Sequence, residues 1–112
     1  MTSRVRILVV AATSRELASP NGWRAHACGV GPVEAAASTA AAIAEYGPHA
    51  VLHVGIAGAR RSQALTPASL VIGSASHYCD LTIPAEWAPT VVSPSPLMLG
   101  ILRGALPDAR VL

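Results

Sequence analysis

The stretch that decides the fold is residues 28–59, CGVGPVEAAASTAAAIAEYGPHAVLHVGIAGA. Pro32 suits the first turn of a helix because its ring fixes φ near the helical value, and the alanine-rich run to Tyr46 continues that helix. Gly47-Pro48 is a typical helix stop. Residues 50–56 are apolar on both faces, as in a strand buried within a parallel sheet. The stretch therefore predicts a turn, a helix and a buried strand in succession.

The helix expected at residues 33–46 has an apolar stripe. Val33, Ala37, Ala40 and Ile43/Ala44 recur at helical spacing. Small alanine side chains allow a helix to approach a sheet closely. We therefore expect this stripe to lie flat against the sheet.

Strand-like and helix-like segments alternate on both sides of this stretch. We expect strands at 6–12, 23–30, 50–56 and 69–76, helices at 14–17, 33–46 and 97–106, and an irregular segment at 81–96. The pattern predicts an α/β fold in which helices flank a mixed, mostly parallel sheet, as a single domain over residues 1–112. Residues 109–112 resemble a strand that has barely begun, so we expect the gene product to continue beyond Leu112.

Composition excludes several classes of protein. Of 112 residues, 52% are hydrophobic and 12% charged, which is unlike a disordered tail. A net charge of +2 without an arginine cluster argues against a nucleic-acid partner. The apolar run at 35–44 is too short for a membrane span. Cys28 and Cys79 show neither CxxC spacing nor a neighbouring ligand cluster, so we expect free buried thiols in the cytoplasm and no metal.

Three predicted strands end in small residues or glycine, at 11–14, 29–31 and 55–58. Ligands of parallel sheets bind at the carboxyl ends of strands, so we expect these ends to meet at one crevice. The segment 29–34 begins like a dinucleotide fingerprint, but Glu34 replaces the third glycine, and a structural turn is the favoured interpretation. The segment 55–58 is either a flat-ligand cradle or a tight turn.

Two further residues have competing interpretations. His53 is the only polar side chain in the strand at 50–54, and a hydrogen-bonded core histidine is favoured over a catalytic one. Trp87 lies among the four prolines of segment 81–96, which should keep that segment out of a sheet interior. Because the segment is also apolar, we expect it to contact a second copy of the chain, with folding back onto its own sheet as the alternative.

The segments ILVVAATSREL at 7–17, the stretch at 28–59 and SLVIGSASHYCDL at 69–81 resemble, in order, the nucleoside phosphorylase and nucleosidase superfamily. The likeness is greatest to the hydrolases, 5′-methylthioadenosine/S-adenosylhomocysteine nucleosidase and, more so, futalosine hydrolase. The resemblance implies cofactor-free hydrolysis of a purine-type nucleoside N-ribosidic bond. The alternatives are a purine nucleoside phosphorylase and a non-catalytic fragment that binds a nucleoside or oligomerises.

The resemblance also implies site residues. Val30 and Gly31 would face the nucleoside, and Ile56, Ala57 and Gly58 would contact its base and sugar. Trp87 would cover the pocket of a partner in a homodimer. The arginine and serine that bind phosphate in phosphorylases are replaced by His53 and Ile56, which argues against phosphorolysis.

The catalytic groups are harder to place. Ser14 stands where the hydrolases carry a glutamate that activates water, and Glu16, two residues on, should point elsewhere if the turn is helical. The resemblance implies a domain about twice as long as this chain, so that residues 1–112 are its N-terminal half and the acid that protonates the leaving base would lie beyond Leu112. We therefore expect the 112-residue chain alone to be inactive.

Overall fold

The computed structural model describes residues 4–18, 22–80 and 82–112. The chain divides into two units, Met1–Gly58 and Ala59–Leu112.

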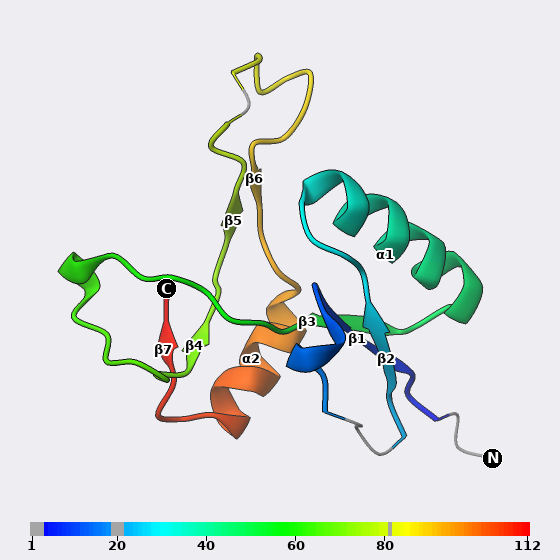
Figure 1. Ribbon diagram of the computed structural model, residues 1–112, viewed down its shortest axis with the longest axis horizontal. Coiled ribbons are helices and arrows are strands. Elements are labelled where there is room, and N and C mark those ends of the chain that lie inside the picture. The colour runs from blue at the N-terminus through cyan, green and yellow to red at the C-terminus, as the bar shows by residue number, and fades with distance from the viewer. Residues whose placement is uncertain (1–3, 19–21, 81) are drawn as a thin grey trace. The chain divides into compact units, whose positions relative to one another are not determined.

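The first unit contains a three-stranded parallel sheet of β1 (Ile7–Ala11), β2 (Arg24–Ala27) and β3 (Ala50–His53), in the order β2-β1-β3 (Figure 1). The central strand is β1, and it is apolar on both faces, as a strand with a neighbour on each side should be. Its last four residues are all buried. The parallel sheet expected from the sequence is thus confirmed.

Helix α1 (Pro32–Tyr46) connects β2 to β3, and its two ends are set by glycine. Gly31 precedes it with φ of 95°, and Gly47 ends it in the left-handed conformation with φ of 61°. Arg6 reinforces this end, because its guanidinium donates to the Gly47 carbonyl oxygen at 3.1 and 2.9 Å. The sequence-based boundaries of this helix are confirmed.

The face of α1 that packs on the sheet differs from the predicted stripe. Ala35, Ala42 and Tyr46 pack against Leu8, Val10 and Cys28. Val33 is 79% exposed and Ile43 is 41% exposed. The predicted stripe was wrong because alanine occurs on nearly every side of this helix, so apolar periodicity alone does not select a face.

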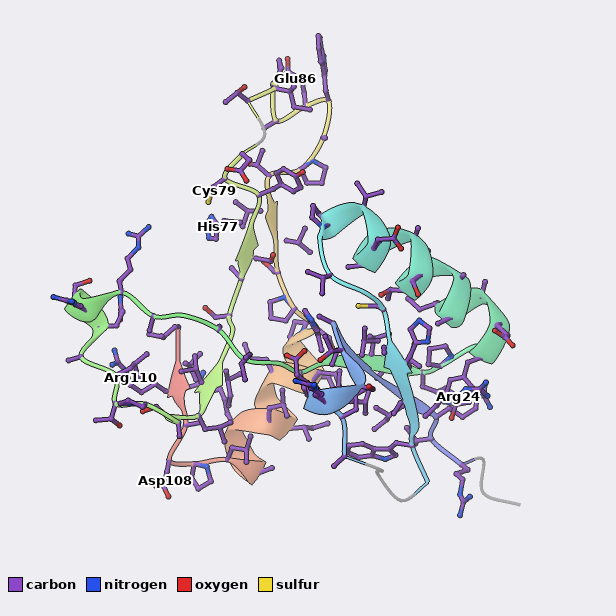
Figure 2. The ribbon with its side chains drawn as sticks, viewed as in Figure 1. Arg24, His77, Cys79, Glu86, Asp108 and Arg110 are labelled. Atoms are coloured by element: carbon purple, nitrogen blue, oxygen red, sulfur yellow. The ribbon has the colours of Figure 1, made fainter. Side chains whose placement is uncertain are left out.

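Polar contacts fix the face that is used (Figure 2). His26 Nε2 lies 2.8 Å from Ser38 Oγ on α1. The Arg24 guanidinium carbon lies 5.3 Å from the centre of the Tyr46 ring, in cation–π contact near the end of the same helix. These two contacts determine which face of α1 lies on the sheet, because the alanine side chains alone do not distinguish one face from another.

The second unit contains one helix and two strand pairs. It comprises a 3-10 turn η2 (Arg61–Gln63), β4 (Val71–Ile72), β5 (Ser76–His77), β6 (Val91–Val92), α2 (Pro96–Ala105) and β7 (Arg110–Val111). Strands β4 and β7 are parallel, and β5 and β6 form an antiparallel hairpin that extends away from α2 (Figure 1). Helix α2 begins at Ser95, whose hydroxyl accepts a hydrogen bond from the Met98 amide at 3.3 Å.

Two expectations for this unit are corrected. The single strand expected at 69–76 is two short strands in different sheets, separated at Gly73–Ala75. The segment 81–96, expected to be irregular, contains the short strand β6, because Thr90–Ser93 lies between Pro89 and Pro94 and provides two residues that pair with β5. This sheet has two strands, so β6 lies at an edge and not in a sheet interior. Leu81, at the start of that segment, lies outside the described residues.

Candidate functional site

The carboxyl ends of β1, β2 and β3 lie at the same edge of the first unit's sheet. Beyond the strands, the Cys28 amide donates to the Ala11 carbonyl at 2.8 Å and the Gly29 amide donates to Ala12 at 3.1 Å. On the other side of β1, the Val54 amide donates to the Val10 carbonyl at 2.9 Å. The three segments expected to form a crevice are therefore neighbours.

The chain after β1 forms a 3-10 turn, η1 (Ser14–Glu16), that folds the Glu16 side chain back onto Thr13. Glu16 Oε1 accepts hydrogen bonds from the Thr13 amide at 3.2 Å and from the Thr13 hydroxyl at 2.9 Å. The turn is three residues long, so the side chain of its third residue, Glu16, reaches back to Thr13, the residue before the turn, as in a capping box. This brings a carboxylate to the end of the central strand.

The same carboxylate reaches the end of β3. Glu16 Oε2 accepts a hydrogen bond from the Ile56 amide at 3.0 Å. The expectation that Glu16 points elsewhere was wrong, because it assumed that a helical turn carries the side chain away from the strand ends. Glu16 instead joins two of the three segments that define the crevice.

Gly55 makes this approach possible. A Cβ atom at this position would lie 2.8 Å from Glu16 Oε2. That separation is too short for carbon against a carboxylate oxygen, so any larger residue would displace the carboxylate. A glycine at this position thus leaves room for the Glu16 carboxylate.

The surroundings of Glu16 favour its charged form. The hydrogen bond from the Ile56 amide lowers the pKa of this carboxyl most, followed by the bond from the Thr13 hydroxyl, with a smaller contribution from the charge of His53. The carboxylate is therefore ionised at neutral pH. It can accept protons or hydrogen bonds, but it cannot donate them.

The second strand end presents an apolar residue between two glycines. Gly29 and Gly31 have φ of 90° and 95°, a region that residues with a Cβ rarely adopt. Val30 between them is 73% exposed. An exposed valine on a glycine-bounded turn is a surface on which a flat apolar ligand can rest.

The third strand end is similar. Ile56 is 91% exposed, and Ala57 and Gly58 are exposed too. Among the described residues, no hydrogen-bond acceptor is found for the amides of Ala57 and Gly58. These two donors are therefore available to a ligand, whereas the Ile56 amide is occupied.

Two other predicted residues are placed by the structure. Ser14 is exposed at the start of η1, and the carboxylate nearest to it in the chain is that of Glu16. His53, at the end of β3, is exposed, so the core-histidine interpretation was wrong. His53 lies on β3, a strand at the edge of the sheet. Val51, on the same face of β3, is 39% exposed, so helix α1 leaves this face of the edge strand uncovered.

The cysteines are free, as expected. Cys28 is buried, but Cys79 is exposed in the chain that follows β5 (Figure 2), which corrects the expectation for that residue. Trp87 is 76% exposed in the loop between β5 and β6. Cys79 and Trp87 both belong to the second unit.

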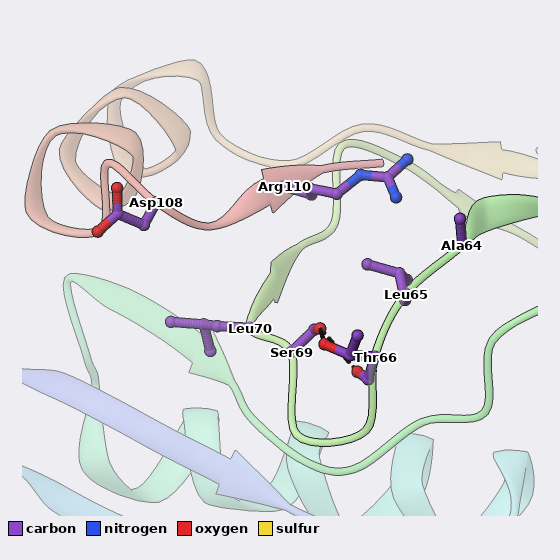
Figure 3. Close-up of a pocket in the computed structure, with 7 residues that line it drawn as sticks. All are labelled: Ala64, Leu65, Thr66, Ser69, Leu70, Asp108 and Arg110. Carbon is purple, nitrogen blue, oxygen red and sulfur yellow. Dashed lines mark hydrogen bonds between the residues drawn. The ribbon is translucent and has the colours of Figure 1, made fainter.

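The second unit has a hollow of about 250 Å³ beside β7 (Figure 3). Some of its polar groups already have partners: the Ser69 hydroxyl donates to the Thr66 carbonyl at 2.7 Å, and the Arg110 guanidinium donates to the Gln63 carbonyl and side chain. In the residues described here, no cluster of three metal-ligating side chains occurs. The strand ends of the first unit are the stronger candidate site.

A comparison with family sequence models identifies the superfamily of the chain. The sequence model of the phosphorylase superfamily matches residues 22–109, most of the chain, including two of the three strand ends. The chain belongs to the phosphorylase superfamily. No curated protein and no solved structure matches it.

Membership of the phosphorylase superfamily gives this chain a nucleoside-processing role. It also confirms the family resemblance found in the sequence. Over the parts of the chain that the structure describes, no helix is long and apolar enough to cross a membrane.

Sequence reasoning named Glu16 but did not place it at the strand ends. The signal was present, since Thr13 followed three residues later by Glu16 is the pattern of a capping box. That pattern returns the glutamate to the start of its turn, and here the start of the turn is the end of the central strand.

Proposed function

We propose that this phosphorylase-superfamily chain supplies part of the active site of a nucleosidase that hydrolyses the N-ribosidic bond of a purine-type nucleoside, such as futalosine. The observation that supports the proposal most is the Glu16 carboxylate at the strand ends, 3.0 Å from the Ile56 amide. Hydrolysis of this bond needs a base that can orient and deprotonate water. Glu16 is the carboxylate in a position to do so.

In the proposed mechanism, the bond from the ribose anomeric carbon to the base nitrogen breaks, and its electron pair leaves with the base. Water forms a new bond to that carbon, and its proton passes to Glu16. A lowered pKa makes Glu16 a weak base, but the sugar develops oxocarbenium-like charge and needs only a weakly activated nucleophile. The acid that protonates the leaving base is not assigned to any residue of this chain.

The nucleoside would lie over the strand ends. Val30, Gly31 and Ile56 would contact the base and sugar through apolar surface, and the amides of Ala57 and Gly58 would donate hydrogen bonds to the ligand. No metal or cofactor is needed for this chemistry. Ser14 is exposed beside this site and lacks an activator of its own, so it is the less suitable base.

Product analysis tests the proposal. The protein encoded by the complete reading frame is incubated with futalosine, 5′-methylthioadenosine or inosine, with and without inorganic phosphate. We expect release of the base and of a sugar with a free anomeric hydroxyl, which keeps any 5′ substituent, in both conditions. Release that depends on phosphate and yields a sugar 1-phosphate would establish the phosphorylase alternative instead.

Glu16→Gln should reduce the rate of base release by about 10²-fold or more, the usual contribution of a positioned base. Glu45→Gln, an exposed acid on α1, is the matched control and should retain full activity. Equal activity of the two variants would contradict the role of Glu16.

The 112-residue chain itself should bind nucleoside without turning it over. Amide resonances of Val30, Ile56 and Gly58 should shift when nucleoside is added, while no base is released. If the protein from the complete reading frame behaves in the same way, the non-catalytic alternative is correct.

A further inference from the structure

The amino ends of the strands in the first unit's sheet, opposite the candidate site, carry arginine side chains. Arg4 and Arg6 precede β1, and Arg24 is the first residue of β2. The parallel register pairs Leu8 with Arg24, so the Cα atoms of Arg6 and Arg24 lie about 8 Å apart on neighbouring strands. Arg4, Arg6 and Arg24 are all exposed. Strand pairing thus gathers arginines that are distant in the sequence into one group, the arginine edge (Arg4, Arg6 and Arg24).

Arg6 is held in a fixed orientation by its neighbours. Its guanidinium donates through Nε and Nη2 to the Gly47 carbonyl oxygen at 3.1 and 2.9 Å. Its backbone amide donates to His49 Nδ1 at 2.9 Å. A guanidinium has about five N–H donors, so the Arg6 side chain can bind a further acceptor without leaving Gly47.

Arg24 is oriented by an aromatic ring instead of a carbonyl. Its guanidinium carbon lies 5.3 Å from the centre of the Tyr46 ring, in the last turn of α1 (Figure 2). Cation–π contact consumes none of the N–H donors of a guanidinium. Arg6 and Arg24 are thus both oriented before a partner binds, which lowers the conformational entropy that binding must overcome.

The charge at the arginine edge is positive. The acids of the first unit are Glu16, Glu34 and Glu45. Glu16 lies at the carboxyl ends of the strands, and Glu34 lies in the first turn of α1, which starts beside them. Glu45, in the last turn of α1, is therefore the acid at this end of the sheet. It offsets only part of the charge of the arginine edge.

We propose that the arginine edge docks an acidic peptide segment of a partner protein in an extended conformation. A guanidinium pairs with a carboxylate through two parallel hydrogen bonds, which are stronger than neutral ones. Alternate carboxylates along an extended peptide stand about 7 Å apart, close to the separation of Arg6 and Arg24. A membrane surface fits less well, since clusters of about 4–8 basic residues recognise it. This interface is independent of nucleoside chemistry at the opposite end of the strands.

Binding of a fluorescein-labelled hexaglutamate peptide to the 112-residue chain tests the inference. Fluorescence anisotropy is measured at low ionic strength, where charge pairing is weakly screened. We expect saturable binding of hexaglutamate and no binding of hexalysine. Arg24→Gln should weaken hexaglutamate binding about fivefold, the effect of one unit charge about 4 Å from another in water. Arg4→Gln should do the same, and it serves if Arg24→Gln does not fold, because Arg4 is exposed and precedes the strand.

Arg15→Gln is the matched control. It removes the same charge from the first unit, but from the exposed turn η1 at the carboxyl ends of the strands, so it should bind hexaglutamate as the wild-type chain does. Equal weakening in Arg15→Gln and Arg24→Gln would show that overall charge alone attracts the peptide, and it would overturn the proposal. Binding to phosphatidylserine vesicles without binding to hexaglutamate would overturn it too, because the arginine edge would then be a membrane contact.

Discussion

At the scale of single residues, the ionised form of Glu16 contributes to folding. Its pKa in the folded chain lies below the ordinary value of 4.5, so its contribution is complete above that value and is lost as the pH falls through the lower, folded-state pKa. We expect the wild-type chain to lose stability relative to Glu16→Gln as the pH is lowered from neutrality to about pH 3. Thermal unfolding of both chains across this range measures the difference.

Glu45→Gln serves as the reference for this comparison, since Glu45 is exposed on α1 and has no hydrogen-bond partner among the described residues. A gap between the wild-type chain and Glu16→Gln that stays constant on acidification would show that the carboxylate contacts do not form in solution.

Gly55 allows the same contact to be broken while the charge is kept. In Gly55→Ala the new methyl group would occupy the space of Glu16 Oε2, so the side chain must move away from the Ile56 amide. Because that amide is the main cause of the lowered pKa, the pKa of Glu16 should rise toward 4.5. Carboxyl ¹³C resonances measure this value directly.

Gly58→Ala is the matched control, because a Cβ there meets nothing within 4 Å and the backbone is not in the left-handed region. Its Glu16 pKa should equal that of the wild-type chain. A low pKa that persists in Gly55→Ala would show that Thr13, rather than Ile56, dominates.

At the scale of elements, the C-terminal end of α1 depends on one backbone conformation. Gly47 has φ of 61°, and its carbonyl oxygen accepts two hydrogen bonds from Arg6. Gly47→Ala should destabilise the first unit by about 1 kcal/mol, the cost of a Cβ in the left-handed conformation. Denaturant unfolding followed by far-ultraviolet circular dichroism measures this loss.

Gly100→Ala, within α2, is the opposite case. A Cβ at Gly100 meets nothing within 4 Å and the backbone is helical, so this change should leave stability unchanged or raise it by about 0.5–1 kcal/mol. If Gly47→Ala and Gly100→Ala change the free energy of unfolding by the same amount, the left-handed conformation at Gly47 does not limit stability.

The elements also show what the sequence could reveal. Prolines and glycines give steric signals that act locally, so the boundaries of α1 followed from Pro32 and Gly47. The packed face of α1 did not follow, because Ser38 and Tyr46 select it through partners on a strand that precedes the helix. The expected crevice was found from small residues at strand ends, whereas the Glu16 contact depends on a turn only three residues long.

At the scale of the whole molecule, the family match covers both units, since residues 22–109 extend from before β2 to the residue before β7. The family match that indicates a nucleoside-processing role therefore includes residues of both units. The strand-end groups, however, all lie in the first unit. A functional contribution of the second unit would therefore come from its own exposed residues.

One of these features is the loop between β5 and β6. Trp87 is 76% exposed there, and the neighbouring strand residues Val91 and Val92 are 48% and 58% exposed. The Trp87 amide donates to the Pro84 carbonyl at 2.9 Å, which fixes the local turn and leaves most of the side chain exposed. Leaving such a side chain in water forgoes roughly 1.5–3 kcal/mol of burial.

We therefore expect Trp87 to bind a second copy of the chain and to cover its nucleoside pocket. Light scattering should give the mass of a dimer for the wild-type chain and of a monomer for Trp87→Ala. Trp23→Ala is the matched control, because Trp23 is also exposed, at 45%, but belongs to the first unit next to β2, and its variant should remain dimeric. A wild-type chain that stays monomeric at high concentration, or a Trp23→Ala variant that dissociates as Trp87→Ala does, would remove the role of the hairpin loop as the interface.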